Sequence, residues 1–262
     1  MNNELESKFL NEYKTLRIIK ETEKQKINII QIRNKVLVLK ESKSFKSIET
    51  QMLRNEAKAL TKLRDCKYIP QIVYYKFDKD TNCLVTKYID SNNLAYINKS
   101  LKLKITEKIL IFIKILDIVE EIHKNNIIHC DLKPGNIVID KENNIYIVDF
   151  GICSIDNENK FNNYGTVKYC SIEQLNKQNL TVKTDLYSLG IIFYEMIFKE
   201  LPFEGEKTEI IYKKNNYIYK KSNDQDLNNI FDRLFSYDKE EALYKNITEL
   251  KRDTLKLLNK YK

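Results

Sequence analysis

Glycine, proline and tryptophan are scarce in this chain. Its 262 residues include five glycines, three prolines and no tryptophan. No glycine occurs before Gly135, so the first half of the chain has no Gly-rich loop of the kind that lets backbone N–H groups approach a phosphate closely. We attribute this bias, together with the abundance of lysine, asparagine and isoleucine, to genome composition and not to function.

Long uninterrupted apolar runs are also missing. The longest apolar stretch, Ile109–Ile122, is interrupted by charged residues and is too short to span a bilayer. Residues Met1–Lys8 lack the apolar core of a signal peptide. We therefore expect a soluble, intracellular, cytoplasmic protein without a membrane segment.

The cysteines and the charge exclude two further classes of function. The five cysteines make an odd count without zinc-like spacing, which predicts reduced thiols and neither disulfides nor a metal site. The net charge of +8 comes from lysines scattered along the whole chain and not gathered with aromatic residues into one stripe. We therefore do not expect a nucleic-acid partner, and the sequence carries no indication of an oligomeric state.

The first third of the chain has the pattern of a small sheet with one helix. A length of 262 residues suits one domain or two small lobes. Apolar and alternating runs predict strands, the segment Ser47–Arg64 has helical spacing, and the turn Asp78–Asn82 separates the last two strands. The predicted strands are Asn11–Lys20, Ile27–Arg33, Val36–Lys40, Ile72–Phe77 and Leu84–Tyr88.

The rest of the chain is mainly helical in pattern, with three short apolar runs in its middle. The segment Ser154–Asn163 has no apolar periodicity, which predicts a mobile stretch. We expect Thr184 or Asp185 to cap the helix that follows it. The predicted helices are Ile105–Lys124, Thr184–Ile197, Asp226–Phe235 and Ile247–Leu258, and the predicted short strands are Asn126–His129, Ile137–Asp140 and Ile145–Asp149.

Polar side chains that could bind a metal or take part in catalysis follow these short strands. Asp131, Lys133 and Asn136 fall on one tight loop, and Asp149 ends the next hairpin. Two carboxylates and an amide oxygen are hard ligands that suit Mg²⁺ bound together with phosphate oxygens, and a lysine can neutralise charge on a phosphoryl group. If Asn136 and Asp149 hold the metal, Asp131 remains to accept a proton from an attacking hydroxyl.

These residues also resemble a known family. The order His-x-Asp-x-Lys-x-x-Asn, followed by Asp149-Phe-Gly151, resembles the catalytic and metal-binding loops of eukaryotic-type (Hanks-type) serine/threonine protein kinases. The stretch Gly165–Gln174 resembles the end of their activation segments. The resemblance implies an α+β, two-lobed fold with a small antiparallel β-sheet lobe that carries one helix and a mainly helical second lobe. It implies one catalytic domain over residues 1–262, with the lobes at about 1–88 and 89–262.

The resemblance implies a role for each polar residue of the site. Asp131 is then the catalytic base, Lys133 contacts the transferred phosphoryl group, and Asn136 and Asp149 bind Mg²⁺, or Mn²⁺, which the same ligands accept. A threonine at the place of Thr166 bonds the base and the lysine in these kinases, which favours serine or threonine over tyrosine as acceptor. ATP is the implied cosubstrate and a protein the implied substrate.

A nucleotide site in the first part of the chain is implied in the same way. Lys40 would grip the α and β phosphates and be held by Glu56, while Thr86 would guard the back of the adenine pocket. Val38 stands where a smaller alanine is usual. The remaining residues that the resemblance assigns to the nucleotide are Lys87, Ile89 and Val138.

Besides Val38, the chain departs from the family in its Gly-rich loop, before the catalytic aspartate and at Ser171-Ile172-Glu173, which replaces the usual Ala-Pro-Glu or Ser-Pro-Glu. Glu21–Lys26 replaces the Gly-rich loop, and Lys24 or Lys26 is a hypothetical substitute for its phosphate-binding backbone. Cys130 replaces the arginine before the catalytic aspartate, which predicts activity without phosphorylation of the activation segment. The arginine expected near Leu243 to hold Glu173 is absent, which puts docking of the activation segment in question.

The leading hypothesis is therefore a serine/threonine protein kinase that transfers the γ-phosphoryl group of MgATP to a protein hydroxyl. The missing Gly-rich loop motivates an alternative, a catalytically weak pseudokinase that serves as a scaffold. A third hypothesis is a small-molecule phosphotransferase, since such enzymes share a His-x-Asp loop. They generally lack the Lys133-Pro134 pair and the Gly165-Thr166 segment found here.

Overall fold

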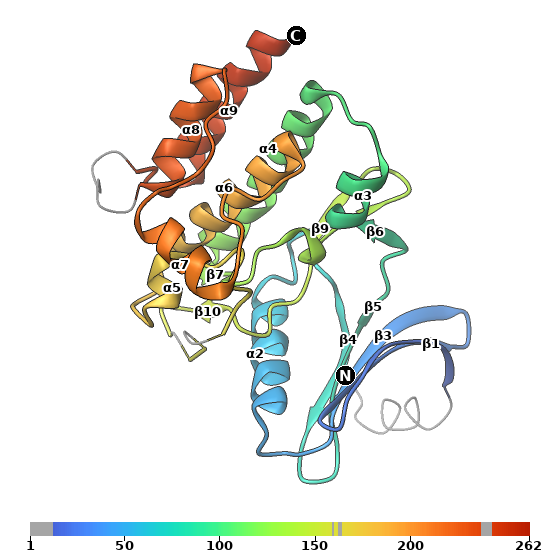
Figure 1. Cartoon of the computed structure of the whole chain (residues 1–262). Helices are drawn as coiled ribbons and strands as arrows, with labels where there is room; N and C mark the ends of the chain where they lie inside the picture. Colours follow the sequence, from blue (N-terminus) through green and yellow to red (C-terminus); the bar gives the residue numbers. More distant parts are fainter. Residues whose placement is uncertain (1–12, 159, 162–163, 237–242) are drawn as a thin grey trace. The chain divides into compact units, whose positions relative to one another are not determined.

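The structure is a computed structural model that describes residues 13–158, 160–161, 164–236 and 243–262. The chain divides into two units, Met1–Asp90 and Ser91–Lys262 (Figure 1). Among the described residues, no helix is both long enough and apolar enough to cross a membrane.

The first unit is built on a five-stranded antiparallel sheet in the order β1-β2-β3-β5-β4. Alternating apolar side chains of its inner strands form the core on one face, because successive residues of a strand point to opposite faces. Strand β1 is exposed along its whole length. The strands are β1 (Lys14–Glu21), β2 (Gln25–Ile32), β3 (Lys35–Ser42), β4 (Ile72–Phe77) and β5 (Asn82–Lys87).

Helix α2 (Ile48–Lys62) packs against β3 and β4 of this sheet. It begins after Ser47, whose hydroxyl accepts a hydrogen bond of 3.2 Å from the backbone N–H of Thr50. Such a cap satisfies one of the donors that every helix start leaves unpaired. The helix expected over Ser47–Arg64 is thereby confirmed, and its burial of Glu56 places a carboxylate against the sheet.

The second unit is mainly helical, with two very small sheets in the orders β6-β8-β9 and β7-β10. Figure 1 shows α8 and α9 side by side, and α9 also packs against α4. The helices are α3 (Leu94–Ser100), α4 (Ile105–Lys124), α5 (Ile172–Leu175), α6 (Val182–Phe198), α7 (Lys207–Asn215), α8 (Gln225–Phe235) and α9 (Ile247–Tyr261). The strands are β6 (Ser91–Asn93), β7 (Ile127–Ile128), β8 (Ile137–Asp140), β9 (Ile145–Ile147) and β10 (Ser154–Ile155), with a 3₁₀ turn η1 at Pro134–Asn136.

Aromatic rings fill the interior between α4, α6 and α8. Phe112 and Phe193 stack with their ring centroids 4.2 Å apart, and Phe193 in turn contacts Phe231. Gly190 allows α6 and α8 to approach closely, since a Cβ atom there would lie 2.9 Å from atoms of Leu234 and Phe235. This packing makes α6 a rigid support for the loops at its N-terminal end.

The structure confirms the predicted α+β fold class and moves several boundaries. The expected cap of the helix over Thr184–Ile197 is wrong: α6 begins earlier, with Thr181 as its N-cap in a capping box with Thr184. Asp185 therefore lies inside the first helical turns, fully buried. Residues 11–12 of the first predicted strand, and residues 159 and 162–163 of the expected mobile stretch, lie outside the described residues.

Candidate active site

A buried ion pair joins the sheet and the helix of the first unit. Lys40 on β3 donates to both carboxylate oxygens of Glu56 on α2, at 2.7 Å each. The Glu56 side chain is 5% exposed and that of Lys40 is 16% exposed. A charged hydrogen bond in such a place is strong and directional, so the pair holds the Lys40 ammonium in one position. The structure thus brings these two predicted residues together.

The other residues predicted for the nucleotide in this unit lie on β3, β5 and the chain after β5. Val38 and Thr86 face each other across the β3–β5 ladder, with Val38 half-buried and Thr86 buried. The N–H of Lys87 donates to the Gln71 carbonyl at 2.9 Å. This N–H group is therefore already bonded within the protein. The carbonyl oxygen is the backbone atom of Lys87 that is left for the predicted contact with the nucleotide. Ile89 is half-buried.

The glycine-free turn between β1 and β2 uses its own backbone donors. The Thr22 hydroxyl accepts hydrogen bonds from the N–H groups of Lys24 and Gln25, at 3.3 and 3.0 Å. Glu21 forms an ion pair with Lys26 at 3.2 Å, which offsets the negative charge of Glu21. Two N–H groups that could face a phosphate are thus consumed within the turn, and exposed Lys24 is the remaining candidate cation.

Three side chains of the second unit form a hydrogen-bonded triangle. Lys133 donates to Asp131 Oδ2 at 2.5 Å and to Thr166 Oγ1 at 3.0 Å. The Thr166 hydroxyl donates to Asp131 Oδ1 at 3.1 Å. The Asn136 amide donates to the Asp131 carbonyl at 2.9 Å and to Oδ2 at 3.1 Å. Four predicted residues therefore meet, and each Asp131 carboxylate oxygen has a donor that orients it.

Asp185 of α6 holds the backbone that carries this triangle. Its carboxylate accepts from the N–H groups of His129 and Cys130, at 2.8 and 2.9 Å, and from His123 Nε2 at 2.8 Å. Burial by itself raises the pKa of this carboxyl. The hydrogen bonds from His123 and the His129 backbone more than offset that effect, so the pKa lies below its ordinary value. An ionised Asp185 thus stabilises the left-handed backbone of Cys130, whose φ is 65°.

The residues expected to bind a metal lie on neighbouring loops. Asn136 ends the turn η1, and its carbonyl accepts from the N–H of Val148, one residue before Asp149. Because the Asn136 amide nitrogen is bound to Asp131, its Oδ1 is the side-chain atom left to act as a ligand. One amide oxygen and one carboxylate suit Mg²⁺ or Mn²⁺ when phosphate oxygens complete the shell. Val138, also predicted for the nucleotide, follows on β8 and is half-buried.

The end of the predicted activation segment is firmly docked by contacts that the sequence did not reveal. Ser171 and Gln174 form a capping box at the start of α5. The Gln174 amide also donates to the Cys130 carbonyl at 2.7 Å, and the Ser188 hydroxyl donates to the Tyr169 carbonyl at 2.9 Å. These bonds tie the segment both to the catalytic loop and to α6. The sequence signal available for Gln174 was its position three residues after a serine, which is the spacing of a capping box.

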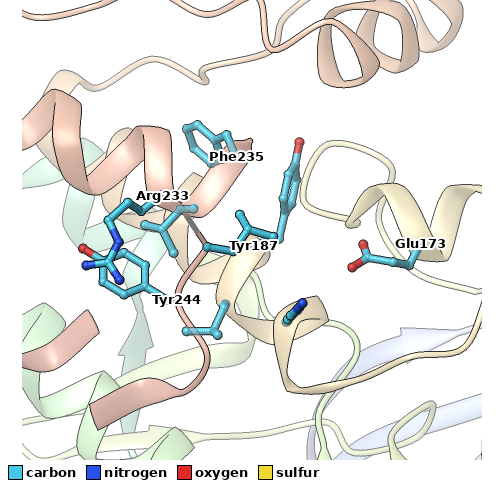
Figure 2. Close-up of a pocket in the computed structure, with 9 residues that line it drawn as sticks. Glu173, Tyr187, Arg233, Phe235 and Tyr244 are labelled. Atoms are coloured by element: carbon cyan, nitrogen blue, oxygen red, sulfur yellow. The ribbon is translucent and has the colours of Figure 1, made fainter. Parts of the chain in front are cut away.

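Glu173 borders a cavity, and the sequence predicted that it would lack the arginine partner that is usual in the family. Figure 2 shows the cavity, with Tyr187 between Arg233 and Glu173 in this view. Arg233 instead binds Asp253 at 2.7 Å and stacks on the Tyr244 ring. Within the part of the chain that the structure describes, no basic side chain pairs with Glu173. Docking of the activation segment therefore depends on other residues.

The sequence model of the protein kinase domain family matches residues 19–260. The chain belongs to this family, as its catalytic-loop motif predicted.

Named relatives support the same assignment. The chain is similar to the probable serine/threonine-protein kinase PknB of Lactococcus lactis subsp. lactis, with 34% identity over 50% of this chain and 22% of that protein. It is similar to the serine/threonine-protein kinase PrkC of Bacillus subtilis, with 32% identity over 62% of this chain and 26% of that protein. A probable serine/threonine-protein kinase of Clostridium perfringens, CPE1738, is 32% identical over 69% of this chain and 27% of its own length. These matches span about a quarter of the length of each relative.

Proposed function

We propose that this protein is a serine/threonine protein kinase whose two units act as one catalytic domain over residues 1–262. It transfers the γ-phosphoryl group of ATP, as a complex with Mg²⁺ or Mn²⁺, to a serine or threonine hydroxyl of a protein. The single observation that carries the proposal is the triangle of Asp131, Lys133 and Thr166. It joins a proton acceptor, a cation and a positioning hydroxyl, which are the groups that phosphoryl transfer requires.

In the proposed reaction, Asp131 accepts the proton of the attacking hydroxyl as the new P–O bond forms and the bond to the ADP oxygen breaks. A positioned base of this kind contributes about 10²–10⁴-fold to the rate. Lys133 neutralises negative charge on the phosphoryl group during transfer. Thr166 is hydrogen-bonded to both Asp131 and Lys133, and its presence together with Lys133 favours serine or threonine over tyrosine as acceptor.

Two further sets of residues handle the nucleotide in this proposal. Lys40, held by Glu56, binds the α and β phosphates. Asn136 and Asp149 hold the divalent cation, which when bound offsets charge on the phosphate oxygens. Thr86 and the backbone of Ile89 border the adenine.

The proposal is tested by transfer of labelled γ-phosphate from ATP to a generic basic protein and to the kinase itself. Wild type is compared with Asp131→Asn and with Asp140→Asn, a matched control on the adjoining strand β8. We expect labelled serine or threonine with wild type and with the control, and a loss of at least about 10²-fold with Asp131→Asn. If wild type binds ATP but transfers no phosphate, the proposal is wrong.

Activity is also proposed to be independent of phosphorylation in the activation segment. Cys130, which replaces an arginine, is buried and its thiol has a raised pKa because of that burial, so it offers no charge to a phosphate group. Phosphatase-treated protein should keep its full transfer rate. A large loss of activity after this treatment, reversed by incubation with ATP, would contradict this part of the proposal.

A further inference from the structure

Lys214 on α7 is a lysine with no exposed surface. Its relative exposure is 0%, which places it among the largest fully buried side chains of the described residues. A lysine removed from water loses the hydration of its charge, and this loss opposes folding unless the group gains partners. The contacts of its ammonium group therefore show which interactions compensate for this loss of hydration.

The Lys214 ammonium binds the loop that follows Thr166. It donates to the carbonyl oxygens of Val167 and Cys170, at 2.9 and 2.6 Å. The rings of Tyr187 and Phe203 lie 5.3 and 5.9 Å from it, within the range of a cation–π contact. Burial lowers the pKa of Lys214 to about 7. Both its charged and its neutral form carry at least two N–H donors, so both carbonyl bonds persist in either state.

The loop itself is a single tight turn. The N–H groups of Tyr169 and Cys170 both donate to the Thr166 carbonyl, at 2.7 and 2.9 Å. Residues 166–170 are therefore mechanically connected, and Lys214 binds carbonyls near both ends of the turn. The Thr166 hydroxyl at the start of the turn is the group that donates to Asp131. A displacement of the turn would thus alter the contact with the proposed base.

Lys214 provides a link that Glu173 does not. Glu173 has no basic partner among the described side chains, whereas Lys214 reaches the same segment from a different helix. The other side chains that hold this segment, Gln174 and Ser188, are uncharged and bind different carbonyls. Among the described residues, Lys214 is the side chain that hydrogen-bonds to both the Val167 and the Cys170 carbonyl oxygens.

We propose that Lys214 is a positioning residue, which binds the Val167 and Cys170 carbonyl oxygens and so keeps Thr166 hydrogen-bonded to Asp131 and Lys133. It acts through the turn and does not touch the reacting groups. This role rests on the proposed kinase function, because the positioned contact is the one that orients the proposed base.

The first test is the substitution Lys214→Met, which keeps the length and apolar stem of the side chain and removes its donors. Lys207→Met, an exposed position on the same helix, is the matched control. We expect kcat of Lys214→Met to fall about tenfold or more with the KM for ATP changed less than about threefold, because the loss affects orientation and not nucleotide binding. A folded Lys214→Met protein with the kcat of wild type would overturn the proposal.

A double-mutant cycle with Thr166→Ala separates positioning from general stability. If Lys214 acts through Thr166, Lys214→Met lowers kcat by no more than about threefold once Thr166 has been removed, since residues that act as a unit are not additive. An equal fold loss in both backgrounds is the result of a purely structural role and rejects the inference.

Hydrogen exchange tests the same contact without any enzymatic activity. In Lys214→Met, the amides of Tyr169 and Cys170 should exchange faster than in wild type, whereas those of α9 should not change. Unchanged exchange at both amides overturns the proposal. If wild type transfers no phosphate, the proposed function fails and this measurement still decides the role of Lys214. Should Lys214→Met not fold, Lys214→Gln, which keeps an N–H donor on a shorter chain, is measured in the same way.

Discussion

The catalytic loop of the second unit and the β1–β2 turn of the first unit are built in opposite ways. The loop is supported by a buried carboxylate, Asp185, and by the triangle around Asp131, so its polar groups are held by charged hydrogen bonds in buried or partly buried positions. The turn is exposed, follows an exposed strand and is closed by the hydroxyl of Thr22. Hydrogen bonds to charged groups contribute more when they are shielded from water.

The two regions should therefore respond differently to substitution. In the catalytic loop, removal of one group leaves buried partners unsatisfied, whereas in the turn water replaces whatever is lost. The first unit contains one buried charged pair, Lys40 and Glu56, among the residues predicted for the nucleotide. Effects on transfer should therefore decrease from the support of the catalytic loop, through this pair, to the β1–β2 turn.

The largest effect is expected for Asp185→Ala. The substitution leaves the N–H groups of His129 and Cys130 buried without an acceptor, which should cost about 3–5 kcal/mol of unfolding free energy and lower transfer at least about 10²-fold. Asp185→Asn keeps one acceptor oxygen and should lose less of both. Urea unfolding and initial rates of phosphate transfer measure the two effects. If Asp185→Ala has nearly the unfolding free energy and transfer rate of wild type, the catalytic loop does not depend on buried support more than the β1–β2 turn does, and the proposed difference is wrong.

The next effect is expected for Lys40→Met. It leaves the Glu56 carboxylate buried without this partner, and it should lower kcat/KM for ATP about 10²-fold and destabilise the protein by about 3 kcal/mol. The double variant Lys40→Met with Glu56→Gln removes both charges and should recover stability but not activity. Recovery of activity in the double variant would show that Lys40 acts only as the partner of Glu56.

A smaller effect is expected in how the unfolding free energy depends on pH, because of Lys214. The pKa of Lys214 is lowered from 10.5 to about 7 in the folded protein, so between these values the unfolded chain binds one more proton than the folded one. Stability should rise with pH in this window, by up to about 1.4 kcal/mol per pH unit relative to Lys214→Met. Its titratable neighbours, Cys170 with a pKa of about 11 and Tyr187 with a pKa well above its ordinary value, stay protonated there.

Urea unfolding of both proteins at pH 7, 8 and 9 measures this slope. Because the other titrating groups are shared, they cancel in the difference between wild type and Lys214→Met. A constant difference across the three pH values would show that Lys214 keeps its ordinary pKa in the folded protein.

The smallest effect is expected in the β1–β2 turn. Lys24→Ala with Lys26→Ala should raise the KM for ATP only about two- to fivefold, because exposed charges contribute little. Lys24→Ala alone should account for most of that change, since Lys26 is paired with Glu21. An unchanged KM for ATP in the double variant would show that neither lysine contributes to phosphate binding. A loss as large as that of Lys40→Met would instead make this turn the dominant phosphate contact.

Local sequence predicted the catalytic loop well because its chemistry depends on spacing within one short stretch. Asp131, Lys133 and Asn136 are close in sequence, so a single turn brings them together, and Asp185 holds the backbone that precedes this turn. Thr166 was found through its resemblance to a known segment, and the structure places its hydroxyl in contact with Asp131. The pairing of Lys40 with Glu56 was predicted in the same way and is observed.

Contacts between distant segments that match no motif of the family were not predictable. Lys214 and Gln174 look like surface residues in the sequence, since lysine and glutamine are mostly exposed in folded proteins. The start of α6 was misplaced because Thr181 and Thr184 are both good cap residues, and the structure has Thr181 as the N-cap. No periodicity in a single segment contains that information.

Motifs and hydrophobic periodicity are local properties, and they predicted the family, the main strands and helices and the set of groups available for phosphoryl transfer. They did not predict β6, α3, β10, α5 or α7. The contacts that hold those groups in place depend on tertiary packing. Burial selects partners by proximity in space, so it brought Lys214 to the Val167 and Cys170 carbonyls and left Glu173 without a basic partner among the described residues. Which buried polar groups are satisfied is a property of the packed chain.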